Sequence, residues 1–177
     1  MSADERKLVM SAQRGNRAAL ATVLKWHEHD LYASALVILK SSWDAQDAVQ
    51  ETLYEACARL GSLREPSKLK AWLSTILVRK CYQYLATRRP VPAADDVRDQ
   101  QASIFVGTER DDDVLQAIAH LPQEQRLVIV LRFFQDLSYA DIERATGWPS
   151  GTVKSRLNRA LRQLRGALSH RSVEHGL

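Results

Sequence analysis

Apolar residues recur at spacings of three and four along most of the chain, which is the period of an amphipathic α-helix. In the first half this pattern predicts helices over residues 17–40, 45–60 and 67–88, and Gly61 follows the second as a residue type that often ends helices. Apolar and polar residues nowhere alternate over the length of a strand. We therefore expect an all-α fold.

The second half carries the same period in shorter pieces. Helices are predicted near residues 113–120, 122–134, 139–146 and 152–168, and Pro122 suits the opening of the second. Four short helices of this kind are expected to pack as a compact bundle.

A polar connector separates the two halves. Pro90 and Pro92 lack amide donors and disfavour helical backbone at the residue before them, so the preceding helix should end there. The residues that follow are mostly polar and keep neither the helical nor the strand period. We predict two small helical domains, residues 1–89 and 113–177, joined by a flexible linker over residues 90–112.

The charges divide the 177 residues in the same way. Residues 1–89 hold 14 basic and 9 acidic groups, residues 90–113 hold 2 and 7, and residues 114–177 hold 9 and 5. Two basic blocks thus flank an acidic connector, which favours separate parts that meet a polyanion.

Several classes of function are disfavoured. The apolar runs fall far short of the roughly 20 residues that a membrane span needs, and no secretory signal opens the chain, so we expect a cytoplasmic protein without membrane insertion. Cys57 and Cys81 have no zinc or disulfide spacing and are expected to be buried thiols. His27 and His29 fall on different faces of a helix, and neither a glycine-rich phosphate loop nor a nucleophile elbow occurs. We expect no catalytic residue, metal or cofactor, and hence no enzyme.

A helix-turn-helix is predicted near the C-terminus. Ser138 precedes Asp141 by three residues in an approximate capping box, so a helix should begin at Tyr139. Gly147 should end it, and Ser150 should cap the next helix. This order of helix, glycine turn and helix is typical of a DNA-binding motif.

The second helix of this motif has a polar face without acids. Six basic residues and no acidic one occur from Ser150 to Arg171. In the major groove arginine can pair with guanine and asparagine with adenine, while smaller polar groups reach bases or phosphates. The apolar stripe, expected to be buried, comprises Val153, Leu157, Ala160, Leu161, Leu164 and Leu168. The predicted DNA contacts are Thr152, Lys154, Ser155, Arg156, Asn158, Arg159 and Arg162. The alternative is the solvated face of an ordinary bundle helix.

A basic segment with aromatic residues precedes the linker. Its cations include Arg64, Lys68, Lys70 and Arg79. Such a segment could follow a phosphate backbone. Trp72 is expected to pack in the core, and stacking on an unpaired base is the alternative for this residue. Lys80 falls within the apolar stripe of its helix and is expected to pair or to reach the surface.

The C-terminal motif resembles a known family. The segments LPQEQR (121–126), LSYADI (137–142) and GTVKSRL (151–157) look like region 4 of the sigma-70 family, in its extracytoplasmic-function group. The resemblance implies that the minus-thirty-five promoter element is contacted by Lys154, Ser155, Asn158 and Arg159, with Arg156 and Arg162 nearer the phosphates.

The N-terminal half resembles the same family independently. The segment DAQDAVQET (44–52) is similar to the region 2.2 helix, which implies that Asp47, Gln50 and Glu51 dock on the beta-prime clamp helices of RNA polymerase. These residues share the side away from the apolar stripe, where they could meet arginines of a partner, and a solvated face is the alternative. Residues 63–73 resemble the loop and helix that capture and melt the minus-ten element. The match is looser here: Pro66 departs from the family pattern, Leu63 and Leu69 replace common phenylalanines, and Arg79 stands where asparagine is frequent. The implied contacts there are Arg64, Ser67, Lys68, Lys70, Trp72 and Arg79.

The resemblance therefore implies a sigma-type initiation factor. Its first domain would dock on core RNA polymerase and open the minus-ten element, and its second would read the minus-thirty-five element. The implied partners are the clamp helices and beta flap of core polymerase, promoter DNA and an anti-sigma factor, and the free chain is expected to be a monomer.

Two other functions remain open on the residues alone. A one-component regulator would have a similar C-terminal motif, but it would bind operators as a dimer and without polymerase. A helical protein-interaction module would show no salt-dependent affinity for DNA. A sigma factor should bind core polymerase first and promoters only in that complex.

Overall fold

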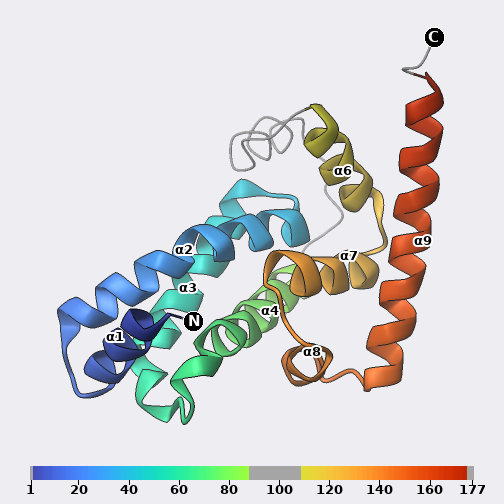
Figure 1. The fold of residues 1–177 in the computed structure, drawn as a ribbon. Helices are drawn as coiled ribbons and strands as arrows, with labels where there is room; N and C mark the ends of the chain where they lie inside the picture. The colour runs from blue at the N-terminus through green and yellow to red at the C-terminus, as the bar shows by residue number, and fades with distance from the viewer. Residues whose placement is uncertain (1, 88–108, 175–177) are drawn as a thin grey trace.

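The fold is given by a computed structural model that describes residues 2–87 and 109–174. All regular elements in these two stretches are helices, so the all-α fold with two helical domains is confirmed for them. Figure 1 shows the N-terminal helices, coloured blue to green, beside the C-terminal helices, coloured yellow to red. Most of the predicted linker, residues 90–112, lies outside the described residues.

The N-terminal domain begins with a helix that the apolar period did not predict. Ser2 Oγ accepts a hydrogen bond from the Glu5 N–H at 3.1 Å, so the pair Ser2 and Glu5 was a capping signal in the sequence. Asn16 and Ser41 cap the next two helices in the same way. The four helices are α1 (Ala3–Gln13), α2 (Arg17–Leu39), α3 (Ser42–Arg59) and α4 (Leu69–Thr87).

Two short 3-10 turns connect α3 to α4. They span Leu60–Ser62 and Pro66–Lys68, and Pro66 suits the first position of its turn because it has no amide donor to leave unpaired. The predicted helices over residues 17–40, 45–60 and 67–88 are therefore confirmed, with ends shifted by a few residues.

The C-terminal domain also has the predicted helices. They are α6 (Glu109–His120), α7 (Gln123–Ile129) with a π-helical turn (Val130–Phe134), α8 (Tyr139–Thr146) and α9 (Ser150–Glu174). The first of them begins at Glu109, inside the stretch that the sequence assigned to the linker. The helix α8 has the predicted bounds, because Ser138 caps its start and Gly147 ends it in the left-handed conformation with φ 73°.

The N-terminal core lies between α2, α3 and α4. Leu31, Leu36, Leu73 and Leu77 are all at most 1% exposed there. Burial of one such side chain is worth roughly 1.5–3 kcal/mol, so this apolar contact holds the three helices together.

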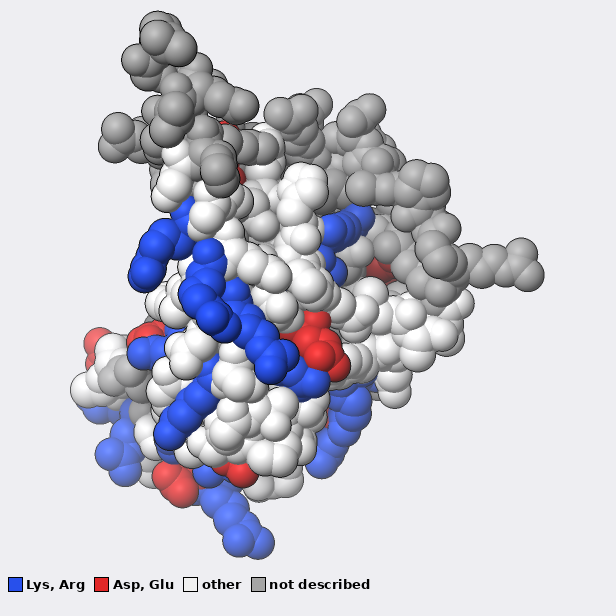
Figure 2. Space-filling view, turned by 90° about the vertical axis from the view of Figure 1, so that its right-hand side faces the viewer, with Lys and Arg blue, Asp and Glu red and all other residues white. Residues whose placement is uncertain are grey.

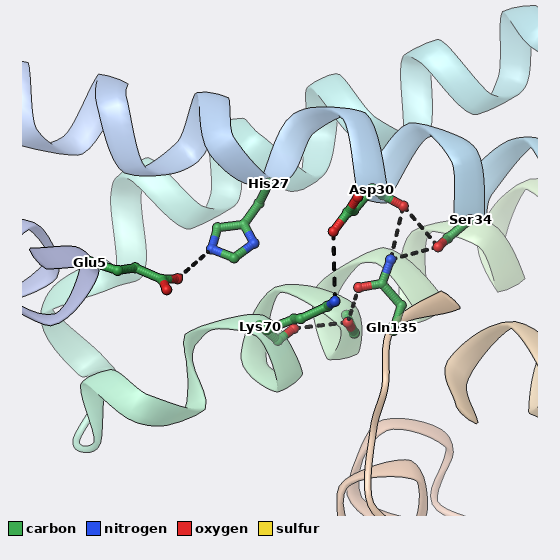
Figure 3. Close-up of polar contacts among 7 residues, drawn as sticks. Glu5, His27, Asp30, Ser34, Lys70 and Gln135 are labelled. Atoms are coloured by element: carbon green, nitrogen blue, oxygen red, sulfur yellow. Dashed lines mark hydrogen bonds and ion pairs between the residues drawn. The ribbon is translucent and has the colours of Figure 1, made fainter. Parts of the chain in front are cut away.

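The two domains pack directly against each other, with α4 along α8 and α2 against α6 and α7. Gln135, which follows the π-helical turn, is 1% exposed and reaches into the N-terminal domain. Its Nε2 donates to the Asp30 carbonyl at 2.9 Å and to Ser34 Oγ at 2.6 Å, as Figure 3 shows. The hydroxyl of Ser74 donates to its Oε1 at 3.2 Å. One carboxamide thus joins α2, α4 and the C-terminal domain.

Arg126 makes a second polar connection between the domains. Its guanidinium donates from Nη2 to the Ile38 carbonyl at 3.1 Å and from Nη1 to the Leu121 carbonyl at 3.0 Å. Burial lowers the pKa of Arg126 to about 10, so the group stays charged at neutral pH.

Three side chains test finer sequence predictions. Lys80 Nζ lies 2.9 Å from a carboxylate oxygen of Glu51, so the expected pairing of this lysine is confirmed. Cys81 is buried as predicted, but Cys57 is exposed, and its prediction was wrong. Leu161, predicted in the buried stripe of α9, is 36% exposed. Cys57 and Leu161 both lie at the edge of the apolar stripe of their helix. At such an edge the helical period alone does not determine whether a side chain is buried.

In the described ranges no helix is both long and apolar enough to cross a membrane.

Candidate nucleic-acid interface

The orientation of α9 follows from its apolar stripe. Val153, Leu157 and Ala160 are at most 4% exposed and pack into the C-terminal domain. Since successive helical residues are rotated by roughly 100°, fixing this stripe inward turns the opposite polar face outward. The turn at Gly147 and the N-terminal part of α9 therefore present a convex, polar surface.

The exposed face of α9 carries most of the predicted DNA contacts. Thr152 is half-buried, and Figure 2 shows lysine and arginine side chains gathered on this side of the molecule. Lys154 Nζ lies 5.8 Å from the centre of the Tyr139 ring, which keeps the lysine near the turn end of the helix. The exposed candidates are Lys154, Ser155, Asn158, Arg159 and Arg162.

Arg156 differs from the other candidates on this helix. Its side chain is 20% exposed and its Nη2 lies 2.6 Å from Glu124 Oε2. The guanidinium carbon sits 3.9 Å from the centre of the Trp148 ring, which indicates stacking. The structure therefore turns this arginine toward the start of α7 and the interhelical turn.

The lysine and arginine side chains of the basic segment before the linker form ion pairs with acidic residues on different helices. Lys68 lies 3.5 Å from Asp141 of α8, Lys70 lies 3.6 Å from Asp30, and Arg79 pairs with Glu55. The cations are 36–50% exposed, whereas their partners Asp141 and Glu55 are only 8% and 18% exposed. Only the pair Lys70–Asp30 is exposed on both sides, which makes it a weak surface ion pair. Arg64 and Ser67, in the turns before α4, are exposed.

A cleft of about 540 Å³ lies between α4 and the C-terminal end of α8, beside the region where the two helices pack together. Trp72 is half-buried in its wall, so neither burial in the core nor full exposure describes this residue. Burial raises the pKa of Tyr82, an α4 side chain in the cleft lining, to about 12, and the charge of Glu124 contributes to the rise. The polar and aromatic lining comprises Arg59, Trp72, Thr75, Arg79, Tyr82 and Thr146.

A second candidate surface lies on α3. Asp47 and Gln50 are exposed and share one face with two aromatic residues, Trp43 and Tyr54, which are 79% and 81% exposed. The spacings of four, three and four put all four on one stripe, which we call the docking stripe. A groove of about 520 Å³ between α2 and α3 borders it and includes Gln50 in its lining. Exposed large aromatic side chains are typical of protein interfaces.

The sequence interpretation missed the two aromatic residues of the docking stripe. Both stand outside the apolar stripe of α3, and large apolar residues on a polar face were the available signal.

Glu51 is held more firmly than its neighbours on α3. Lys80 and the Tyr84 hydroxyl, which donates at 2.9 Å, both contact its carboxylate. The hydrogen bond from Lys80, and then that from Tyr84, lowers the pKa of Glu51 below its usual range. This carboxylate therefore ties α3 to α4 while it remains about half exposed.

Within the described residues, no group of three or more histidine, cysteine, aspartate or glutamate side chains is placed to hold a metal. The arrangement can bind a polyanion along α9 and a protein along α3.

Comparison with protein families gives two matches. The family described as sigma-70 region 2 matches residues 24–91, and sigma-70 region 4 matches residues 111–164.

Named relatives match over most of the chain. The chain is 34% identical over 159 residues to the RNA polymerase sigma factor SigV of Bacillus subtilis, covering 88% of this chain and 95% of that protein. It is 31% identical over 169 residues to the ECF RNA polymerase sigma factor SigM of Mycobacterium tuberculosis, covering 93% and 84%.

Solved structures share the fold. The sigma factor RpoE in complex with the anti-sigma factor NepR from Bartonella quintana matches with a TM-score of 0.68 and 29% identity, covering 84% of this chain and 96% of that one. CnrH in complex with the cytosolic domain of CnrY matches with a TM-score of 0.69 and 24% identity, covering 94% and 97%.

Proposed function

The chain belongs to the sigma-70 family of RNA polymerase sigma factors, in its extracytoplasmic-function group, and from this premise we propose how its surfaces divide the work of transcription initiation. Its function is to direct promoter-specific initiation. The chemistry of RNA synthesis then stays with the polymerase, and the chain contributes binding, in the cytoplasm where the polymerase acts. Residues 1–89 form the docking and strand-opening domain, and residues 113–177 form the upstream-reading domain.

The helix α9 reads the minus-thirty-five element in the major groove. The observation that carries this proposal is its exposed face, which has basic and amide side chains and no acid through residue 169. Asn158 and Arg159 are exposed and carry the amide and guanidinium groups that pair with base edges, and Lys154, Ser155 and Arg162 suit bases or phosphates nearby. Thr152, half-buried at the start of the helix, suits a phosphate.

The docking stripe on α3 binds the beta-prime clamp helices of core polymerase. Asp47 and Gln50 supply polar contacts, and Glu51 lies beside them with its carboxylate oriented by Lys80. Trp43 and Tyr54 supply the apolar anchors that such an interface needs, because buried aromatic residues carry much of the energy of protein association. A second contact, between the C-terminal domain and the beta flap, completes the attachment.

The segment from Arg64 to Arg79 captures the minus-ten element. Its cations exchange their acidic partners for phosphates, while Trp72 in the cleft wall can stack on an unpaired base. The candidate contacts are Arg64, Ser67, Lys68, Lys70, Trp72 and Arg79.

An anti-sigma factor is the expected inhibitor, and the free chain is expected to be a monomer. The RpoE relative was solved with an anti-sigma factor, which supports the class of partner for this chain.

The proposal is tested by separating polymerase binding from DNA binding. Full-length chain, alone and mixed with purified core polymerase, is titrated onto promoter duplex obtained from mapped start sites. We expect tight, sequence-selective binding only with core present. Selective binding of the chain alone, as a dimer, would instead support a one-component regulator.

The matched variants for this test are Arg159→Ala and Arg14→Ala. Both remove one exposed arginine, but Arg14 lies at the end of α1, in the other domain from the proposed upstream-reading helix α9. We expect only the first to reduce selectivity for the promoter over a duplex with an altered upstream element.

A further inference from the structure

Arg156 lies on the inner edge of the recognition helix α9. Counting from the buried Val153 at roughly 100° per residue, Arg156 is about 60° away around the helix axis, whereas Arg162 is about 180° away. The side chain of Arg156 is 20% exposed and its Nη1 is buried, while Arg162 is exposed. A phosphate contact from Arg156 would require its guanidinium to leave this position.

The contacts of Arg156 join three elements of the C-terminal domain. Glu124, in the first turn of α7, lies 2.6 Å from its Nη2. Trp148, in the turn between α8 and α9, lies under the guanidinium plane at 3.9 Å. A planar guanidinium can stack on a ring and bind a carboxylate at its edge at the same time, which an ammonium cannot do. Both contacts therefore specify arginine at this position.

The contacts of Arg156 with Glu124 and Trp148 contribute little to the free energy of unfolding, but they constrain the direction of α9. Glu124 is 55% exposed, so the ion pair is partly screened by water and adds little to stability. What the two contacts fix is the direction of α9 relative to α7 and the turn. Base readout needs side chains held within about 0.5 Å and 10–20° of the productive geometry, so a small change in this direction matters.

We propose that Arg156 is a positioning residue: held by Glu124 and Trp148, it sets the angle at which α9 presents Lys154 and Arg159 to DNA, and it does not itself contact a phosphate. This inference rests on the proposed function of α9 as the reader of the upstream element.

The dependence of promoter binding on salt distinguishes positioning from phosphate contact. Each phosphate contact contributes about 0.9 to the slope of log affinity against log salt concentration on duplex DNA. We expect holoenzyme with Arg156→Ala to bind its promoter about tenfold more weakly with an unchanged slope. In the control, Arg162→Ala, which removes an exposed arginine of the same helix, the slope should fall by about 0.9.

Two further variants keep the test decisive if Arg156→Ala disturbs the fold. Arg156→Lys retains a charge that could reach a phosphate but cannot stack and pair together, so it should bind as weakly as Arg156→Ala. Glu124→Gln leaves α9 intact and should also weaken selective binding without changing the slope. The double variant Arg156→Ala, Glu124→Gln should be no weaker than Arg156→Ala alone.

Three outcomes overturn the inference: a slope reduced by about 0.9 in Arg156→Ala, full rescue by Arg156→Lys, or unchanged binding in Glu124→Gln. Failure of the proposed function is a different result, because wild-type holoenzyme would then show no selectivity for the upstream element. That result would overturn both claims together.

Discussion

At the scale of single residues, the environment decides which of several similar side chains is available. Arg156, Arg159 and Arg162 lie within seven positions on one helix, yet only the last two are exposed. The difference comes from Glu124 and Trp148, which are close in space but supplied by other elements. A residue type within a motif therefore does not establish a contact until its neighbours are known.

Arg159→Ala should relax promoter choice. Loss of one base contact costs roughly 1–3 kcal/mol and weakens discrimination mainly at the base pair that the arginine reads. The measurement is run-off transcription on promoters varied one position at a time in the upstream element. Equal preference of the variant and the wild-type chain at every position would contradict the assignment.

The two cysteines should differ sharply in reactivity. Burial raises the pKa of the Cys81 thiol to about 12, and the thiolate is the reactive form, so this group should react only after unfolding. Cys57 is exposed and should react in the folded chain. Labelling with a maleimide under native conditions, read by mass spectrometry, should give one modification at Cys57. Modification of Cys81 at a similar rate would contradict its burial.

At the scale of elements, the sequence predicts features that depend on neighbouring residues, such as helix ends, but not contacts between residues far apart in the chain. The bounds of α8 followed from Ser138 and Gly147, because a cap and a glycine act within a few residues of the helix that they bound. The same kind of signal at Ser2 and Glu5 marked α1, which the apolar period alone did not reveal. By contrast, Gln135 binds Ser34 and Asp30 across more than a hundred positions, and no periodic pattern encodes such a pair.

The same distinction between local and distant information applies to the candidate binding surfaces. Periodicity predicted which face of α9 is polar, since one helix contains all the information needed. It did not predict that Lys68 and Arg79 hold Asp141 and Glu55, because those acids lie on other helices.

The docking stripe of α3 should bind core polymerase through both charge and aromatic area. Asp47→Lys reverses a charge there, and Tyr54→Ala removes an exposed ring that contributes nothing to the core of the free chain. Each should weaken core binding, the second by about 1–2 kcal/mol, without lowering the melting temperature. Competition binding to core polymerase measures the effect. Asp4→Lys, an exposed charge reversal on α1, is the control and should bind as the wild type does.

At the scale of the whole molecule, the two proposed DNA-contacting segments lie much closer together than the promoter elements that they are proposed to bind. Elements centred near positions minus thirty-five and minus ten are about 25 base pairs apart, or about 85 Å at about 3.4 Å per base pair. Yet Lys68 of the proposed minus-ten segment lies 3.5 Å from Asp141 of the C-terminal domain. If the proposed minus-ten and minus-thirty-five contacts are correct, binding of both elements would require the packed arrangement of the free chain to open.

Gln135→Ala should loosen this packing. The substitution removes the hydrogen bonds that Gln135 makes to Asp30, Ser34 and Ser74 across the domain boundary, and it leaves a cavity where the buried carboxamide was. It therefore destabilises only the closed arrangement, in which those contacts exist. Single-molecule energy transfer between dyes at Gln46→Cys on α3 and Gln163→Cys on α9, in a Cys57→Ser background, reports the separation. We expect a broader and longer distance distribution.

The control for this measurement is Gln13→Ala. That carboxamide also donates two hydrogen bonds, to the carbonyls of Leu60 and Leu63, but both lie within the N-terminal domain. Its loss should leave the distance distribution unchanged. The same distribution for Gln135→Ala and the wild-type chain would show that the carboxamide does not hold the domains together.

Start-site mapping tests the central claim most directly. Purified core polymerase transcribes a genomic DNA library with and without the full-length chain, and the 5′ ends of the transcripts are sequenced. The account predicts a discrete set of new start sites that share upstream and downstream elements and that weaken together when Asp47→Lys replaces the wild-type chain. An identical set of transcript ends with and without the chain would contradict it.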